Sequence, residues 1–118
     1  MMSTAPPLTL TRDQASRLQA YLQTYRRYAL AALLPGTERN TTLRILQTMQ
    51  GKLIAALDQH PVSFQLVLTT EEMTTLKTMV TEIMLLYARQ PESAERLATL
   101  ADLAALKASL RSLERMRR

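Results

Sequence analysis

The sequence contains no cysteine and no tryptophan, and it has only one histidine and two glycines among 118 residues. Without cysteine there is no disulfide framework and no thiolate to act as a nucleophile or metal ligand. A single histidine leaves no pair for a zinc site, and two glycines leave no phosphate-binding loop. These absences argue against an enzyme, and the sequence predicts no catalytic residues, no metal, no cofactor and no small-molecule ligand.

Long apolar runs are also missing. The longest unbroken apolar stretch, residues 28–34, has seven residues, whereas a membrane-spanning helix needs about 20. The N-terminus has neither the basic start nor the apolar core of a signal peptide. We therefore expect a soluble cytoplasmic protein with no membrane attachment. The high content of leucine, alanine, methionine, glutamine and arginine favours helix over sheet.

The chain is organised around residues 64–87, FQLVLTTEEMTTLKTMVTEIMLLY. Thr69 and Glu72 have the spacing of a capping box, in which two side chains bind free backbone N–H groups at a helix start. An apolar stripe with helical spacing follows, from Met73 to Tyr87. The stretch therefore predicts a well-defined helix start followed by an amphipathic helix.

The same pattern occurs 58 positions earlier. The lead-in L-x-L-T-x-[DE]-[EQ] begins at Leu66 and again at Leu8, and the apolar stripes that follow align without an insertion. Any two amphipathic helices share spacing, so the shared lead-in is the stronger evidence for a repeat. We interpret the chain as an internal duplication, with repeat one in about residues 8–60 and repeat two in about residues 64–113.

Each repeat has the pattern of a helical hairpin behind a short extended segment. Pro35 and Gly36 end the first helix at about residue 34, Thr37 is the expected cap of the second, and Pro91 separates the third helix from the fourth. One hairpin leaves an apolar face uncovered, so the two hairpins must pack together. The sequence therefore predicts an all-α fold, a four-helix bundle made of two duplicated hairpins.

This bundle is predicted to form a single domain over residues 8–118, behind a disordered leader of residues 1–7. The extended segments at residues 8–10 and 63–68 alternate like short strands. Pairing within one chain and pairing across a dimer are both compatible with the sequence. Either arrangement would add a small β element to a helical fold.

Leucine repeats along the last helix, and this pattern is typical of a core face or of a seam between subunits. More apolar residues lie off the main stripes than one small bundle needs, so we infer a second contact surface. It would be a homodimer seam or a groove for another protein. The residues predicted for this surface are Leu103, Leu106, Leu110, Leu113, Met79 and Leu86.

The net charge of +5 is unevenly distributed along the chain. Residues 1–60 have a balance of +4, residues 61–106 a balance of −3, and the basic C-terminal end, residues 107–118, a balance of +4. Twelve of the fifteen basic residues are arginine, which favours bidentate contacts to carboxylate or phosphate groups. The charge distribution therefore indicates pairing with oppositely charged groups, either within the protein or in a partner.

Two interpretations of this charge remain open. In the first, the basic and acidic parts of the chain pair within the bundle or between subunits, and the last arginines suit the negative end of a helix. In the second, the arginines hold a nucleic-acid backbone without reading its sequence, because no base-reading motif is present. The candidate contacts to phosphate or partner are Arg26, Arg27, Arg39, Arg44, Arg111, Arg115, Arg117 and Arg118.

The sequence as a whole predicts a non-catalytic helical interaction or assembly module. Its partner would be a second copy of the chain, most simply in a homodimer, or another protein in a larger complex. The alternative is a small helical subunit of a nucleoprotein complex that contacts the nucleic-acid backbone.

Overall fold

The computed structural model describes residues 7–59 and 62–116, and these residues form four helices and two short strands. In chain order the elements are β1 (Leu8–Thr11), α1 (Arg12–Ala32), α2 (Thr37–Gln59), β2 (Ser63–Leu66), α3 (Thr70–Ala88) and α4 (Ala94–Met116). The predicted all-α fold with minor β pairing is confirmed. Apart from Pro7, the predicted leader lies outside the described residues, as do Arg117 and Arg118. No helix in the described ranges is long and apolar enough to cross a membrane.

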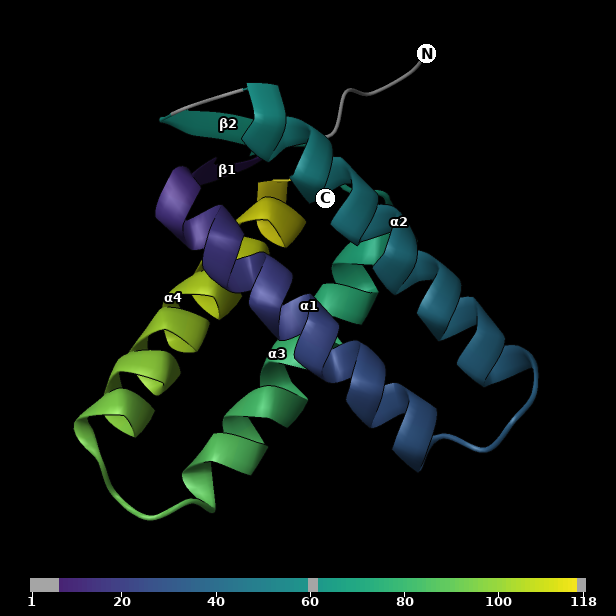
Figure 1. The fold of residues 1–118 in the computed structure, drawn as a ribbon. Helices are drawn as coiled ribbons and strands as arrows, with labels where there is room; N and C mark the ends of the chain where they lie inside the picture. Colours follow the sequence, from purple (N-terminus) through teal and green to yellow (C-terminus); the bar gives the residue numbers. More distant parts are fainter. Residues whose placement is uncertain (1–6, 60–61, 117–118) are drawn as a thin grey trace.

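The helices form two hairpins, in which α1 packs on α2 and α3 packs on α4. Figure 1 shows α1 and α3 crossing in the middle of the molecule, with α2 and α4 on opposite sides. The loops of both hairpins lie toward one end of the molecule, and the strand pair lies at the other end. The hairpin tips therefore spread apart, while their opposite ends are held together.

The capping boxes that start α1 and α3 are present as predicted. The Thr69 hydroxyl accepts from the Glu72 N–H at 3.1 Å, and the Glu72 carboxylate accepts from the Thr69 N–H at 2.9 Å. Thr11 and Gln14 make the same two bonds, at 3.2 and 2.9 Å. Because these bonds join residues only three apart, the repeated sequence produces the same helix start twice, 58 residues apart.

The other helix ends differ slightly from the prediction. Thr37 is the first residue of α2 and not its cap, whereas the Ser93 hydroxyl caps α4 by accepting from the Arg96 N–H at 3.0 Å. The first helix ends at Ala32, two residues early, because Leu33 is already extended on its approach to the Pro35 turn.

The two strands pair antiparallel within the chain, which decides between the two pairings left open by the sequence. Leu8 lies opposite Leu66, and Leu10 lies opposite Phe64. Leu8 and Leu66 are equivalent positions of the two repeats, and an antiparallel pair has local two-fold symmetry. A pseudo-two-fold axis therefore passes between these two residues and relates one hairpin to the other.

The core is formed by the helix faces that meet around this axis and by the inner face of the strand pair. Equivalent positions of the two halves are buried together, with an offset of 58 between α1 and α3 and of 57 between α2 and α4. The offset falls by one because α4 begins 24 residues after the start of α3, whereas α2 begins 25 residues after the start of α1. The matched pairs, each residue at most 2% exposed, are Leu18 and Leu76, Leu22 and Val80, Leu46 and Leu103, and Leu53 and Leu110.

Four of the six residues predicted for a seam between chains belong to this core. They are between 0% and 6% exposed, and a side chain buried within one chain offers no surface to a second chain. The prediction is corrected accordingly: these four are core residues. Leu106 is partly buried against the same core, and Leu86 is 39% exposed. The four core residues are Leu103, Leu110, Leu113 and Met79.

Gly51 lies in the middle of α2, where a β-carbon would meet no atom within 4 Å. No close helix crossing requires glycine there, so Gly51→Ala should raise the free energy of unfolding by about 0.5–1 kcal/mol, because alanine loses less backbone entropy on folding. Gly36 is the matched control, because its φ of +153° is strained for alanine. Urea denaturation should show Gly36→Ala destabilised, and a destabilised Gly51→Ala would contradict the prediction.

Candidate functional site

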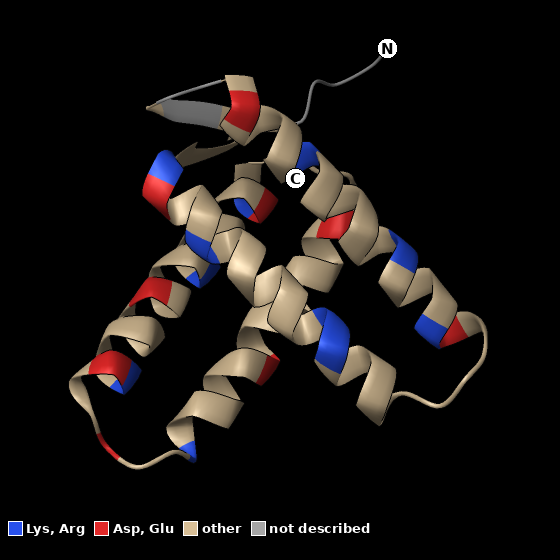
Figure 2. Ribbon diagram, viewed as in Figure 1, with Lys and Arg blue, Asp and Glu red and all other residues tan. Residues whose placement is uncertain are grey.

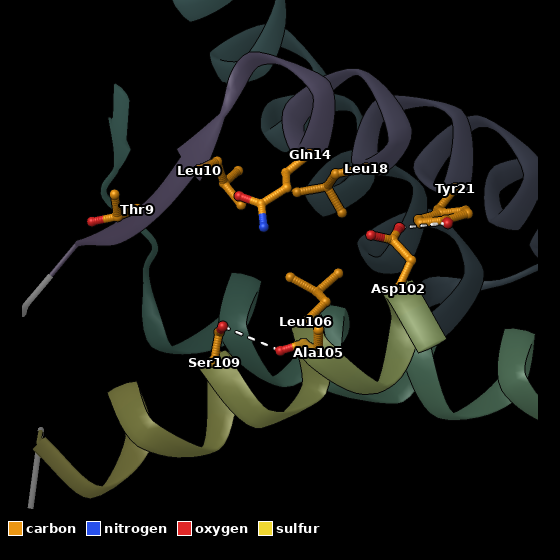
Figure 3. Close-up of a pocket in the computed structure, with 9 residues that line it drawn as sticks. All are labelled: Thr9, Leu10, Gln14, Leu18, Tyr21, Asp102, Ala105, Leu106 and Ser109. Atoms are coloured by element: carbon orange, nitrogen blue, oxygen red, sulfur yellow. Dashed lines mark hydrogen bonds between the residues drawn. The ribbon is translucent and has the colours of Figure 1, made fainter. Parts of the chain in front are cut away.

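Two polar groups of residues link the hairpins, one on each side of the pseudo-two-fold axis. On the side where α1 faces α4, the Tyr21 hydroxyl donates to Asp102 Oδ2 at 2.7 Å (Figure 3), and Arg17 Nε lies 3.1 Å from Asp102 Oδ1. We call these three residues the Asp102 cluster. Burial and the hydrogen bond to Asp102 raise the pKa of Tyr21, and the bond to Asp102 raises the pKa of Arg17. Both donors therefore stay protonated near neutral pH, as suits a structural link.

On the side where α2 faces α3, Lys52 Nζ lies 2.6 Å from Glu72 Oε1 and donates to the Val67 carbonyl at 3.1 Å. Glu72 is only 3% exposed, although it also caps α3. Its other oxygen, Oε2, is buried and has no hydrogen-bond partner among the described residues. A buried carboxylate is costly without a counter-ion, so Glu72 depends on the ammonium group of Lys52. We call these two residues the Lys52/Glu72 pair.

The pseudo-symmetry places different chemistry at equivalent positions on the two sides. With the offsets given above, Glu72 corresponds to Gln14 and Lys52 corresponds to Ser109. A neutral amide and a short hydroxyl thus replace a carboxylate and a lysine. The side where α1 faces α4 therefore lacks the ion pair that closes the other side.

A small cleft lies where the lysine is missing (Figure 3). Figure 3 shows the side chains of Gln14, Leu18 and Leu106 pointing into the space between α1 and α4. The cleft has a volume of about 40 Å³, far below the roughly 300–1,000 Å³ of sites that enclose a small molecule. It therefore has room for one small group of a ligand and not for a whole substrate. We call it the Gln14 cleft, lined by Thr9, Gln14, Leu18, Asp102, Leu106 and Ser109 among others.

The structure does not gather the arginines predicted near the first hairpin turn into one site. Arg26 and Arg27 are exposed on α1, and Arg39 is half-buried with its Nε atom unpaired among the described atoms. Arg44 lines a shallow depression that also contains Glu71. Figure 2 shows basic and acidic residues interspersed along the helices, so the first hairpin has a surface of mixed charge.

Arg111 and Arg115, in contrast, lie together. They line an open depression with Lys77 and Glu114, whose side chains form an ion pair. We call it the α3/α4 depression, and its three cations outnumber its one carboxylate. The sequence did not indicate Lys77 as part of this site, because Lys77 lies 34 positions before Arg111. Only the folding of α3 and α4 into a hairpin brings the two residues together.

Exposed apolar side chains occur on the outer halves of α1 and α3, about one turn beyond the contact between Tyr25 and Glu82. Tyr28 is 38% exposed, Leu85 is 55% exposed and Leu86 is 39% exposed. The Tyr28 ring stacks on Tyr25 with centroids 5.6 Å apart, and burial together with a hydrogen bond to Glu82 of α3 raises the pKa of Tyr25. Tyr25 thereby connects Tyr28 to the α3 turn that precedes the two leucines. We call Tyr28, Leu85 and Leu86 the tip patch.

The Lys52/Glu72 pair was the main contact missed by sequence analysis, which assigned Glu72 only to helix capping. The repeat alignment did contain a signal. Glu72 replaces the neutral Gln14 of the first repeat at a position that the apolar stripe places near the core, and a new charge at such a position needs a partner. The alignment alone does not say which basic residue that partner is.

Comparison with known proteins gave no match to any protein-family model, curated protein or solved structure. Within residues 7–59 and 62–116, no three acidic or histidine side chains are grouped closely enough to hold a metal ion. The assignment of function therefore rests on the surfaces described above.

Breaking the two polar links should have unequal effects on stability. Lys52→Met leaves Glu72 buried without its counter-ion and should cost about 2–3 kcal/mol, less than the ~3–5 of a fully buried pair because the Lys52 side chain is 35% exposed. Arg17→Met should cost about 1 kcal/mol or less, because Arg17 is 49% exposed and Asp102 keeps Tyr21 as donor. Urea denaturation measures both losses.

The double variant Lys52→Met/Glu72→Gln is the control for this comparison. Removing the buried charge together with its partner should recover part of the stability lost in Lys52→Met. Equal losses in Lys52→Met and Arg17→Met would show that Glu72 does not depend on Lys52 in the way described.

Proposed function

We propose that this protein is a non-catalytic helical module that associates with a second copy of itself through the tip patch. The observation that carries the proposal is the exposure of three large apolar side chains, Tyr28, Leu85 and Leu86, on two helices that meet. Large apolar side chains exposed on the outer halves of two packed helices offer surface that a contact with another chain can bury. Burying this surface in a dimer would remove it from water.

The pseudo-symmetry supports a second copy as the partner. Tyr28 and Leu86 are equivalent positions, 58 residues apart, on α1 and α3. Two of the three residues of the tip patch are therefore matched across the pseudo-two-fold axis, and Leu85 adds a third on α3. A two-fold dimer needs a surface that is complementary to itself, and packing α1 of one chain on α3 of the other satisfies that requirement.

The distribution of charge along the chain also supports packing of α1 of one chain on α3 of the other. The first half of the chain has a balance of +4, and residues 61–106 have a balance of −3. Arg26 and Arg27 are exposed beside Tyr28 on α1, whereas Glu82, one turn before Leu86 on α3, is partly buried and bonded to Tyr25 of the same chain. A contact between α1 of one chain and α3 of the other brings the more basic part of one chain toward the more acidic part of the other, which favours this orientation.

Light scattering on the purified protein tests the association. The wild-type chain should have a mass of twice 13.4 kDa, and Leu86→Glu should reduce it to that of one chain, because a carboxylate in an apolar contact loses its hydration. Ile54→Glu is the matched control: Ile54 is 47% exposed on α2, outside the patch, and its variant should keep the wild-type mass. Circular dichroism should show both variants folded.

The proposal fails if the wild-type protein has the mass of one chain at all accessible concentrations. It also fails if Leu86→Glu and Ile54→Glu lower the mass equally, because the contact would then not be specific to the tip patch.

The α3/α4 depression supports a second candidate function, binding of a nucleic-acid backbone. Lys77, Arg111 and Arg115 surround it with a single carboxylate, that of Glu114. Arg111 and Arg115 stand one turn apart on α4, so both side chains point to the same side of the helix. Such a site would hold phosphate groups without selecting a base sequence.

Fluorescence anisotropy with labelled single- and double-stranded DNA and RNA tests this candidate. We expect binding that weakens steeply between low and near-physiological salt, as counterion release requires. Arg111→Ala/Arg115→Ala should weaken binding, whereas the control Arg26→Ala/Arg27→Ala, which removes the same charge from α1, should retain it. No binding at low salt would eliminate the candidate, since a net charge of +5 gives every electrostatic advantage there.

A further inference from the structure

The Gln14 cleft has a filled counterpart in the same molecule. On the other side of the pseudo-two-fold axis, the Lys52 ammonium binds two acceptors, Glu72 Oε1 at 2.6 Å and the Val67 carbonyl at 3.1 Å. The acceptors come from the start of α3 and from the residue that follows β2. The counterpart therefore shows what kind of group this backbone arrangement holds.

The first acceptor is repeated in the Gln14 cleft. Gln14 Oε1 lies 2.9 Å from the Thr11 N–H, as Glu72 Oε1 lies 2.9 Å from the Thr69 N–H. The two capping boxes thus hold their side-chain oxygens in the same way at the start of α1 and α3. An amide oxygen has a second lone pair, so Gln14 Oε1 can accept another hydrogen bond.

The second acceptor is repeated as well, because Thr9 is the equivalent of Val67. The Arg12 N–H donates to the Val62 carbonyl at 2.9 Å, which makes these two residues a hydrogen-bonded pair of the antiparallel ladder. Hydrogen-bonded and non-hydrogen-bonded residue pairs alternate along such a ladder, so Thr9 and Gln65 form a non-hydrogen-bonded pair. The Thr9 carbonyl therefore points away from β2. The equivalent carbonyl, that of Val67, accepts from Lys52.

The ammonium group itself is missing on this side. Ser109 occupies the position of Lys52, and its hydroxyl bonds within its own helix, to the Ala105 carbonyl at 3.2 Å. Asp102 lies at the cleft wall with its two oxygens bound by Arg17 and Tyr21, and Leu106 and Ala105 add an apolar surface. The volume of about 40 Å³ fits the end of an alkylamine.

We infer that the Gln14 cleft binds a primary ammonium group carried on an aliphatic chain, in the place that the Lys52 ammonium takes on the other side. Gln14 Oε1 and the Thr9 carbonyl accept its N–H bonds, and Leu106 contacts its methylene groups. Polyamines and the lysine side chain of another protein have this chemistry. The inference is independent of self-association, since the cleft lies at the strand end and the tip patch does not.

Titration of the ¹⁵N-labelled protein with n-butylammonium chloride tests the inference by NMR. Saturable shifts should be confined to the Gln14 side-chain amide and to the backbone amides of Thr9, Leu106 and Ser109. Tetramethylammonium has the same charge and no N–H donor, so it should produce none of these shifts. The absence of shifts with butylammonium, or equal shifts with both ions, would overturn the inference.

Two variants test whether the butylammonium shifts come from binding in the Gln14 cleft. Ser109→Lys supplies an internal ammonium at the equivalent of position 52, so it should abolish the butylammonium shifts and raise the melting temperature. Lys52→Ser should open a second, equivalent site at Glu72, and butylammonium should partly restore the melting temperature of that variant by binding the folded state. Restoration in Lys52→Ser without binding to the wild-type cleft would show that the probe works and that the inference is wrong.

Spermidine and Nα-acetyl-lysine amide, titrated in the same way, distinguish the two sources of the ammonium group. Tighter binding of spermidine would identify a free polyamine as the ligand class, and tighter binding of the lysine derivative would identify a side chain of a partner protein. Failure of both to shift the cleft residues would overturn the inference.

Discussion

The pairing of β1 with β2 is the constraint on which the rest of the structure depends. β1 ends at its capping box and β2 leads into one after two further residues, so pairing the strands brings the starts of α1 and α3 together and fixes where these helices cross. The axis through Leu8 and Leu66 then determines which helix faces meet in the core. A two-stranded ladder is marginal by itself, and it persists here because its leucines are covered by the helices that it positions.

The two repeats share this backbone arrangement but differ at one equivalent position near the core, which is charged in one repeat and neutral in the other. Where the second repeat buries a carboxylate, it needs Lys52 to reach across from α2. Where the first repeat has the neutral Gln14, no counter-ion is required, and a serine in place of the lysine leaves a cleft. The cost of burying an unpaired charge thus explains why an internally repeated protein has unequal sides.

The surfaces discussed above lie on different parts of the molecule. The tip patch belongs to the outer halves of α1 and α3, the Gln14 cleft to the strand end of α1 and α4, and the α3/α4 depression to the later turns of α4. Figure 1 shows the hairpin tips and the strand pair at opposite ends. Contact between two chains at their tips would therefore leave the cleft open to a further ligand.

The sequence by itself left open whether the extended segments form strands, but it determined the helices and both capping boxes and indicated the repeat. These features depend on hydrogen bonds between residues three apart and on side-chain periodicity along one element. Tertiary structure alone decided that Leu110 is core while Leu86 is exposed. It also brought Lys52 to Glu72, 20 residues away, and Tyr21 to Asp102, 81 residues away. Those contacts depend on how the helices cross around the strand pair, and neither helical periodicity nor local charge specifies that crossing.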